Sequence, residues 1–194
     1  MSITFEAWPK TPRLFRDMVI TEKIDGTNAA VIVEADGDGG YTVGAQSRKR
    51  LITPADDNFG FAAWVYDNAE DLARLLGPGR HFGEWWGSGI QRGYGLTTGE
   101  KRFSLFNVGR YTALLSAASA DGLEIPGVDI VPMLHTGPFD LEVVGSWLET
   151  LRTTGSVVAP GFMRPEGVVV YHTAARQVFK ALLENDDKPK GEAA

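Results

Sequence analysis

The sequence predicts an α+β fold in which short strands dominate and helices lie between groups of strands. Three observations lead to this class. Runs of about seven β-branched and apolar residues recur between glycine-containing turns, two segments carry apolar residues at helical spacing, and the last ordered segment reads as a strand pair. The chain has 194 residues, of which 43% are hydrophobic, so it can bury one substantial core.

The first strands are predicted at 18–24 and 29–35, with the letters DGTN between them. The run DGDGG at 36–40 is a strong turn signal, and 41–47 continues as a strand. Together these segments predict a small antiparallel meander whose first turn is a hairpin.

A helix is predicted over 59–76, where apolar residues recur at helical spacing before Gly77-Pro78-Gly79 ends the pattern. Strands are expected at 80–87 and 102–111. A second helix is expected within 139–152, with Asp140 as its N-cap.

The closing strands are predicted at 165–172 and 176–183, joined by a short turn. The tail from about residue 184 is polar, and no internal repeat or linker interrupts the sequence. We therefore expect residues 1–194 to form a single domain.

The composition excludes several classes of protein. There is no cysteine, which rules out disulfides and thiolate metal sites, and the three histidines lack the spacing of metal ligands. No secretory signal and no apolar run of about 18 residues is present, so we expect a cytoplasmic protein without a membrane partner. The net charge of −6 argues against a general nucleic-acid binder, although a local basic groove is compatible with it.

Four charged residues stand at the ends of predicted strands: Lys23, Glu84, Glu166 and Lys180. Charged side chains that interrupt apolar strands are costly unless they are paired or used in function. Glycines next to Glu84 and Glu166 allow a ligand to approach the backbone closely. The four residues are therefore expected to converge on one site.

Six short motifs carry a resemblance to a known superfamily. They are KIDGTN at 23–28, SR at 47–48, FGE at 82–84, FSLFNV at 103–108, EGVV at 166–169 and VFK at 178–180. In this order they resemble the motifs of the covalent nucleotidyltransferases, which include DNA ligases, RNA ligases and mRNA capping enzymes. Glu22 and Asn28 make the sequence most similar to the ATP-dependent RNA ligases.

The resemblance implies a ligase adenylation-domain fold of two antiparallel sheets flanked by helices, with the nucleotide between them. It also implies ATP as cosubstrate and Mg²⁺ or Mn²⁺ as the metal. Lys23 would be the nucleophile and Lys180 a second catalytic residue. Contacts to the nucleotide would come from Glu22, Lys23, Asn28, Arg48, Glu84, Phe106, Glu166 and Lys180. The metal would be held by Asp25, Glu84 and Glu166.

Several of these positions have a second interpretation. Lys23 taken alone fits a solvated turn. Arg48 has rivals in the two basic residues that follow it, Phe103 competes with Phe106 as the aromatic that stacks on the base, and Asn28 could cap the turn or contact ribose. Of Trp85 and Trp86, which alternate along a strand, one is expected in the core.

Two departures from the family pattern stand out. The fifth motif usually carries lysine-x-lysine, but here Ala181 and Leu182 follow Lys180, and Lys188 or Lys190 would have to substitute. The residues after Lys180 are too few for an oligonucleotide-binding barrel. An accessory RNA-binding protein is therefore a candidate partner, and the oligomeric state is left open.

The expected function is ATP-dependent joining of RNA 3′-hydroxyl and 5′-phosphate ends through lysyl-AMP. One alternative is a DNA nick ligase or a GTP-dependent capping-type enzyme. The other, favoured by the missing second lysine and the acidic net charge, is a catalytically lapsed module that binds a nucleotide or RNA.

Overall fold

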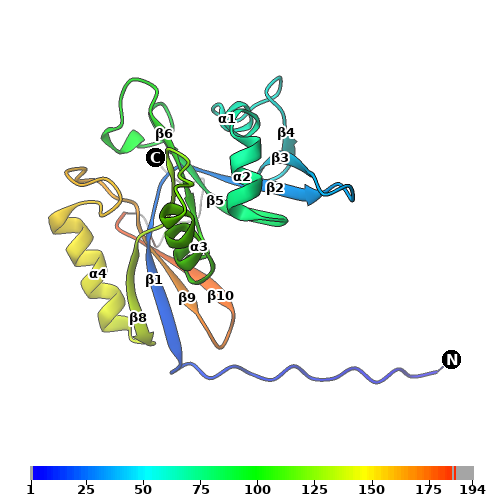
Figure 1. Cartoon of the computed structure of the whole chain (residues 1–194). Coiled ribbons are helices and arrows are strands. Elements are labelled where there is room, and N and C mark those ends of the chain that lie inside the picture. The colour runs from blue at the N-terminus through cyan, green and yellow to red at the C-terminus, as the bar shows by residue number, and fades with distance from the viewer. Residues whose placement is uncertain (1, 185, 187–194) are drawn as a thin grey trace.

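The computed structural model describes residues 2–184 and 186, which form two sheets and four α-helices (Figure 1). The strands are β1 Asp17–Lys23, β2 Thr27–Ala35, β3 Tyr41–Ser47, β4 Leu51–Ile52, β5 Gly79–Gly87, β6 Lys101–Leu105, β7 Val128–Ile130, β8 Met133–Pro138, β9 Gly167–His172 and β10 Gln177–Leu182. The helices are α1 Phe61–Asp67, α2 Ala69–Leu76, α3 Val108–Ala120 and α4 Leu141–Thr154, with a 3₁₀ turn, η1, at Gly93–Gly95.

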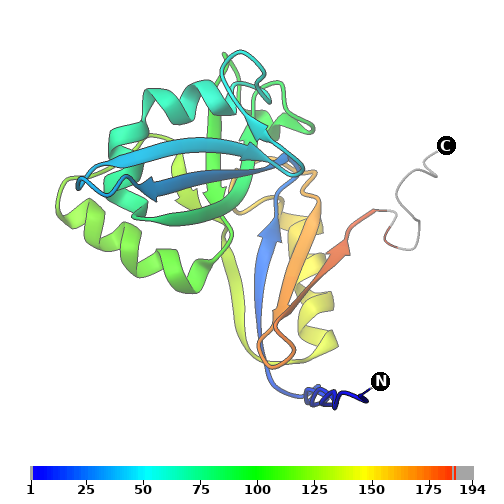
Figure 2. The ribbon, with the colours of Figure 1, turned by 90° about the vertical axis from the view of Figure 1, so that its right-hand side faces the viewer.

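The small sheet has the order β10-β9-β1-β8 and is antiparallel throughout. The large sheet has the order β4-β3-β2-β5-β6-β7. Its strands pair antiparallel except for β6 and β7, which run parallel. The expected pair of sheets is therefore present, with one parallel edge. Figure 2 shows the two sheets crossing where β1 meets the large sheet.

Along the chain, the first strand belongs to the small sheet, the next six form the large sheet, and the last three complete the small sheet. Only β1 precedes the large sheet, and β8, β9 and β10 follow it. The predicted hairpin at DGTN is wrong, because β1 pairs with β8 and β9 rather than with β2. Residues 24–26 instead carry the chain from one sheet to the other, directly after Lys23.

Three helices cover one face of the large sheet. Their apolar side chains meet inward-facing residues of β2, β5 and β6, among them Val31, Trp85 and Phe103. The helix predicted over 59–76 is two helices, because the backbone leaves helical geometry at Asn68 (φ −113°, ψ 19°). The strand predicted over 102–111 ends at Leu105, and α3 begins at Val108.

Helix α4 covers one face of the small sheet (Figure 1). Met18 and Ile20 of β1 lie with Val168 and Val170 of β9 against it. The predicted cap is confirmed, since the Asp140 side chain accepts a hydrogen bond from the Glu142 N–H at 2.8 Å. The opposite face of this sheet is left for a binding pocket.

A third apolar cluster fills the seam between the sheets and contains Ile24, Trp86, Tyr94, Val108 and Val131. Through Ile24, this cluster packs against residues 24–26, which connect the two sheets. Both neighbouring tryptophans of β5 are buried, Trp85 on the helix side and Trp86 in the seam.

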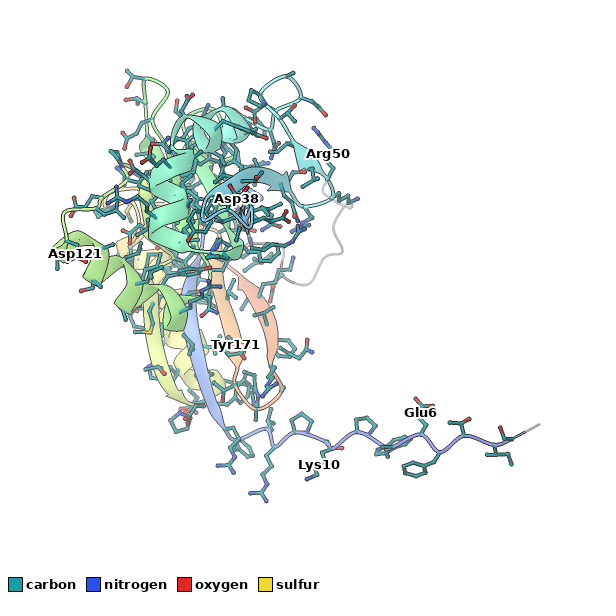
Figure 3. All side chains as sticks on the ribbon, turned by 45° about the vertical axis from the view of Figure 1, so that its right-hand side comes forward. Glu6, Lys10, Asp38, Arg50, Asp121 and Tyr171 are labelled. Atoms are coloured by element: carbon teal, nitrogen blue, oxygen red, sulfur yellow. The ribbon has the colours of Figure 1, made fainter. Side chains whose placement is uncertain are left out.

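Residues 2–13 extend away from the body, as Glu6 and Lys10 show in Figure 3. Within the described part of the chain, no helix is long and apolar enough to cross a membrane.

Candidate active site

Lys23 is the last residue of β1 and lies beside Glu166, the residue before β9. The register pairs Lys23 with Gly167, so neighbouring strands bring the two side chains together. Lys23 Nζ lies 2.6 Å from Glu166 Oε2, and the side chains are 24% and 18% exposed. The amine is thus part-buried at the end of β1, where the chain passes from the small sheet to the large one, and not in a solvated hairpin.

Glu84 of β5 approaches the same point from the large sheet. Its two carboxylate oxygens accept hydrogen bonds from the Gly26 N–H at 3.1 Å and from Asn28 Nδ2 at 3.0 Å. Burial raises the pKa of Glu84 to about 7, opposed by Lys23 and supported by repulsion from Glu166 and Asp25. The structure therefore gathers residues 23, 84 and 166 in one place, as the sequence predicts.

Asn28 connects Glu84 to Arg48, the residue that follows β3. Its side-chain oxygen accepts a hydrogen bond from Arg48 Nε at 2.7 Å. Among the three neighbouring basic residues, Arg48 lines the pocket, whereas Arg50 pairs with Asp56. Asn28 consequently links Arg48 to Glu84.

A pocket of about 650 Å³ opens next to Lys23. Its sheet wall comprises alternate residues of β1, β9 and β10, which face away from α4: Val19, Thr21, Val169, Tyr171 and Val178. Phe106, which is 41% exposed, lines the facing wall, while Phe103 is fully buried in the core. The structure thus brings Phe106, not Phe103, to the pocket.

Glu22 also lines the pocket, but its carboxylate is used inside the protein. It is 1% exposed and accepts hydrogen bonds from Ser156 Oγ at 2.6 Å, Val157 N–H at 2.8 Å and Val158 N–H at 2.9 Å. Burial raises the pKa of Glu22, and these three donors act in the opposite direction. Glu22 therefore ties the segment after α4 to strand β1.

Asp25 is paired with a residue that the sequence reasoning missed. Arg92 Nε donates to Asp25 Oδ2 at 3.0 Å, and the Tyr94 hydroxyl accepts from the Asp25 N–H at 2.9 Å. Residues 88–95 read only as a glycine-rich loop in the sequence. Nothing in the local pattern indicates that this loop reaches under the Lys23 turn, because the contact joins residues far apart in the chain.

Lys180 is exposed on β10 and lies directly opposite Val169 in the register. Strand alternation places Lys180 on the same face as Val178, which lines the pocket. Leu182, two residues further along the strand, is on the same face and occupies the position where the family pattern has its second lysine. The proposed substitutes, Lys188 and Lys190, fall outside the described residues.

The predicted metal ligands do not form a ready-made cage. Among residues 2–184 and 186, no group of three or more His, Cys, Asp or Glu side chains is arranged to hold a metal. Glu84 and Glu166 nevertheless offer hard oxygen donors close to Lys23. This donor set fits Mg²⁺ or Mn²⁺ bound through one or two carboxylates, with water and substrate phosphates completing the shell.

A larger open hollow of about 1000 Å³ contains none of the predicted site residues. Its rim mixes Lys101 and Arg102 with Asp67, Glu100 and Asp129. We assign the chemistry to the smaller pocket, because Lys23, Glu84 and an apolar wall suited to a base line it, and Glu166 contacts the Lys23 amine.

Comparison with known protein families agrees with this geometry. A family model described as RNA ligase matches residues 16–182, which span both sheets and every residue of the site. The chain belongs to the RNA ligase family. The superfamily expected from the motifs is thereby confirmed. No curated protein sequence matches this RNA ligase family member.

Solved structures show the same fold. A glutamate-to-alanine variant of Naegleria gruberi RNA ligase with AMP and Mn matches with a TM-score of 0.65 and 20% identity, covering 91% of this chain and 53% of that one. A lysine-to-alanine variant of that ligase with ATP and Mn gives 0.63 and 20%, covering 90% and 52%. This family member therefore spans about half the length of the solved chains that it matches.

Proposed function

We propose that this protein is an ATP-dependent RNA ligase that joins 3′-hydroxyl and 5′-phosphate ends through a lysyl-AMP intermediate. The observation that carries the proposal is Lys23 Nζ, 2.6 Å from Glu166, at the mouth of an apolar pocket that Glu84 also lines. Family membership and the ATP and AMP complexes of the Naegleria gruberi ligase support the same assignment.

The nucleotide would lie with its base in the apolar part of the pocket. Phe106 would stack on one side of adenine, and Val169 would pack on the other. Arg48 at the pocket edge and Lys180 on the same sheet face would meet phosphate oxygens. Asn28, and Glu22 through its backbone, both in the lining, would complete the contacts to ribose and base.

In the first step, the Lys23 amine attacks the α-phosphorus of ATP. A P–N bond forms, the bond to the bridging oxygen breaks, and pyrophosphate leaves. Lysine must lose a proton before it can attack, and Glu166 Oε2 lies within hydrogen-bond distance to accept it. Positive charge from Arg48 and Lys180 would stabilise the phosphate in the transition state.

The metal would be held by Glu84 and Glu166, with Asp25 as a further predicted ligand. When bound, it would neutralise phosphate charge and orient the pyrophosphate leaving group.

The next two steps use the stored nucleotide. A phosphate oxygen at the RNA 5′ end attacks lysyl-AMP, which breaks the P–N bond and forms a 5′–5′ anhydride. The 3′-hydroxyl then attacks the RNA 5′-phosphorus, and AMP leaves as the phosphodiester bond forms. An accessory RNA-binding protein is a proposed partner for these steps.

Radiolabelled ATP tests the proposal directly. With Mg²⁺ or Mn²⁺, the protein should acquire one AMP, seen as an intact-mass increase that maps to Lys23. Lys23→Ala and Lys23→Arg should both abolish the label, whereas Lys10→Ala, on the exposed N-terminal segment, should keep it. A label that survives in Lys23→Ala would overturn the assignment. Label from GTP, or sealing of nicked DNA rather than RNA, would support the corresponding rival enzyme.

One observation favours a second candidate, a catalytically lapsed nucleotide-binding module. Leu182 stands on the pocket-facing side of β10, where the family pattern has a basic residue. In that case ATP would raise the melting temperature without leaving a covalent label. The intact-mass measurement separates the two functions.

A further inference from the structure

The loop that follows β5 is held in unfavourable backbone geometry. Gln91 and Tyr94 have φ of 45° and 50°, in the left-handed region that non-glycine residues rarely adopt. Three glycines in the same loop, Gly89, Gly93 and Gly95, also have positive φ. Such strain persists only where surrounding contacts hold it, and it is enriched at functional sites.

The contacts that hold this loop are made with the turn that follows Lys23, at Asp25, and with the segment before β9. Arg92 Nε binds Asp25 at 3.0 Å, and one terminal nitrogen donates to the carbonyls of Arg164 and Pro165 at 3.0 and 3.2 Å. The other terminal nitrogen lies 3.4 Å from Glu184. One guanidinium thus joins the turn after the nucleophile to the segment that presents Glu166.

Tyr94 adds a second attachment. Its hydroxyl accepts from the Asp25 N–H at 2.9 Å and lies 3.4 Å from the Lys23 carbonyl oxygen. Its ring is buried against Trp86 and Phe162, with ring centroids 5.4 and 4.5 Å away. Because Gly26 is bound to Glu84 on the other side, the turn is held from two directions.

We propose that Arg92 and Tyr94 form a positioning clamp that fixes Lys23 relative to Glu166 and to the incoming α-phosphorus. Both are positioning residues and contact no substrate. Arg92 has five N–H groups, and four acceptors in the protein already take hydrogen bonds from them. Its guanidinium is therefore used in structural contacts rather than available to bind phosphate. The rate prediction below depends on the proposed function, whereas the prediction on local order does not.

The kinetic test compares lysyl-AMP formation in wild type, Arg92→Gln, Arg92→Lys and Tyr94→Phe. Misplacement of a reacting group by about 1 Å can cost about 100-fold in rate, so we expect Arg92→Gln to slow the step at saturating ATP by about 10- to 100-fold. KM for ATP should stay close to wild type, because the clamp does not touch the nucleotide. Arg92→Lys keeps the charge but loses the fork, and should recover little of the rate.

Arg102→Gln is the matched control. Arg102 is also partly exposed and paired with a carboxylate, Glu100, at 2.6 Å, but it lies at the larger hollow. We expect its rate to match wild type. If Arg92→Gln were as fast as this control, or if it changed KM alone, the clamp would be refuted.

Hydrogen exchange supplies a readout that needs no activity. In Arg92→Gln, amides of residues 23–26 and of Arg164, Glu166 and Gly167 should exchange faster, while those of α1 to α3 keep wild-type protection. Unchanged exchange at 23–26 would overturn the clamp whether or not the protein forms lysyl-AMP. If wild type acquired no AMP label but Arg92→Gln showed faster local exchange, the ligase proposal would be refuted and the clamp proposal would be supported.

Discussion

Gly26 lies so close to β5 that a side chain has no space. A β-carbon there would be 2.5 Å from the Trp85 carbonyl oxygen and 2.8 Å from Trp86 Cβ, both parts of a rigid wall. We expect Gly26→Ala to lower the free energy of unfolding by about 1–3 kcal/mol and to displace the Lys23 turn. Urea unfolding and lysyl-AMP formation measure the two effects.

Gly145→Ala is the control for that change. Gly145 is an exposed interior residue of α4, and nothing lies within 4 Å of the position of an added β-carbon. Alanine there should be neutral or stabilise by about 0.5–1 kcal/mol. A Gly26→Ala protein as stable and as active as Gly145→Ala would contradict the tight packing of the turn.

Because of His81, we expect the stability of the fold to decrease at acid pH. It is fully buried and contacts the Tyr111 hydroxyl and the Gly77 carbonyl oxygen, each at 2.9 Å. Burial lowers the pKa of His81 below its ordinary value. Because the unfolded chain then binds the proton more readily, this residue's contribution is present above about pH 6.5 and is lost as the pH falls below it.

The measurement is urea unfolding at about pH 7.5 and about pH 5.5. Glu22 and Glu84 have raised pKa values, so their protonation at low pH stabilises the fold and opposes the effect of His81. The pH dependence of stability is therefore measured in both wild type and His81→Gln. The variant should lose less stability on acidification than wild type.

Single residues were predictable where their chemistry is unusual for their place in a strand. Lys23, Glu84 and Glu166 interrupt apolar runs, and the structure brings these three together. Arg92 was not predictable, since an arginine in a glycine-rich loop is ordinary until its partners are known. The chemical roles assigned to these three residues, and those assigned to Asp25 and Lys180, stay predictions.

At the scale of elements, α4 begins at a cap that can be tested apart from the site. Asp140→Ala removes the acceptor for the Glu142 N–H and should cost about 1 kcal/mol, whereas Asp140→Ser should retain most of the stability. Thermal unfolding measures this. Lysyl-AMP formation should be unchanged below the melting temperature, because α4 packs on the sheet face opposite the pocket.

The segment after α4 is coupled to the pocket through Glu22. Ser156→Ala removes one donor to a carboxylate that is 1% exposed, and should destabilise the protein by about 1–3 kcal/mol. Urea unfolding measures the loss. Ser146→Ala, an exposed serine of α4, is the control and should change stability little. Equal stability of the two variants would show that Glu22 does not depend on the hydroxyl.

Strong local patterns predicted elements, and weak ones did not. Strands β2, β3 and β5 were found from their apolar runs, within two residues of their ends. Helix α3 was missed because its sequence is rich in small residues and buries only Val108 and Tyr111, so no apolar stripe marks it. The false hairpin has another cause: the partners of β1 lie more than a hundred residues further along the chain.

At the scale of the molecule, the large sheet uses one continuous stretch, 27–130, while the small sheet needs both ends of the described chain. Closing the long loop between β1 and β8 has an entropic cost that the large sheet avoids. During refolding from urea, we expect amides of β2, β3 and β5 to gain protection before those of β1. Pulsed hydrogen exchange measures this order, and simultaneous protection would argue for a single cooperative nucleus.

The late completion of the small sheet has a consequence for biosynthesis. On the ribosome, β1 emerges first and has no strand to pair with until β8 and β9 follow. At about 5–20 residues per second, the roughly one hundred intervening residues take on the order of 5–20 seconds. During that interval an apolar strand and the amine at its end are open to solvent and to chaperones. The wall of the proposed nucleotide pocket is therefore complete only after β9 and β10 have been translated.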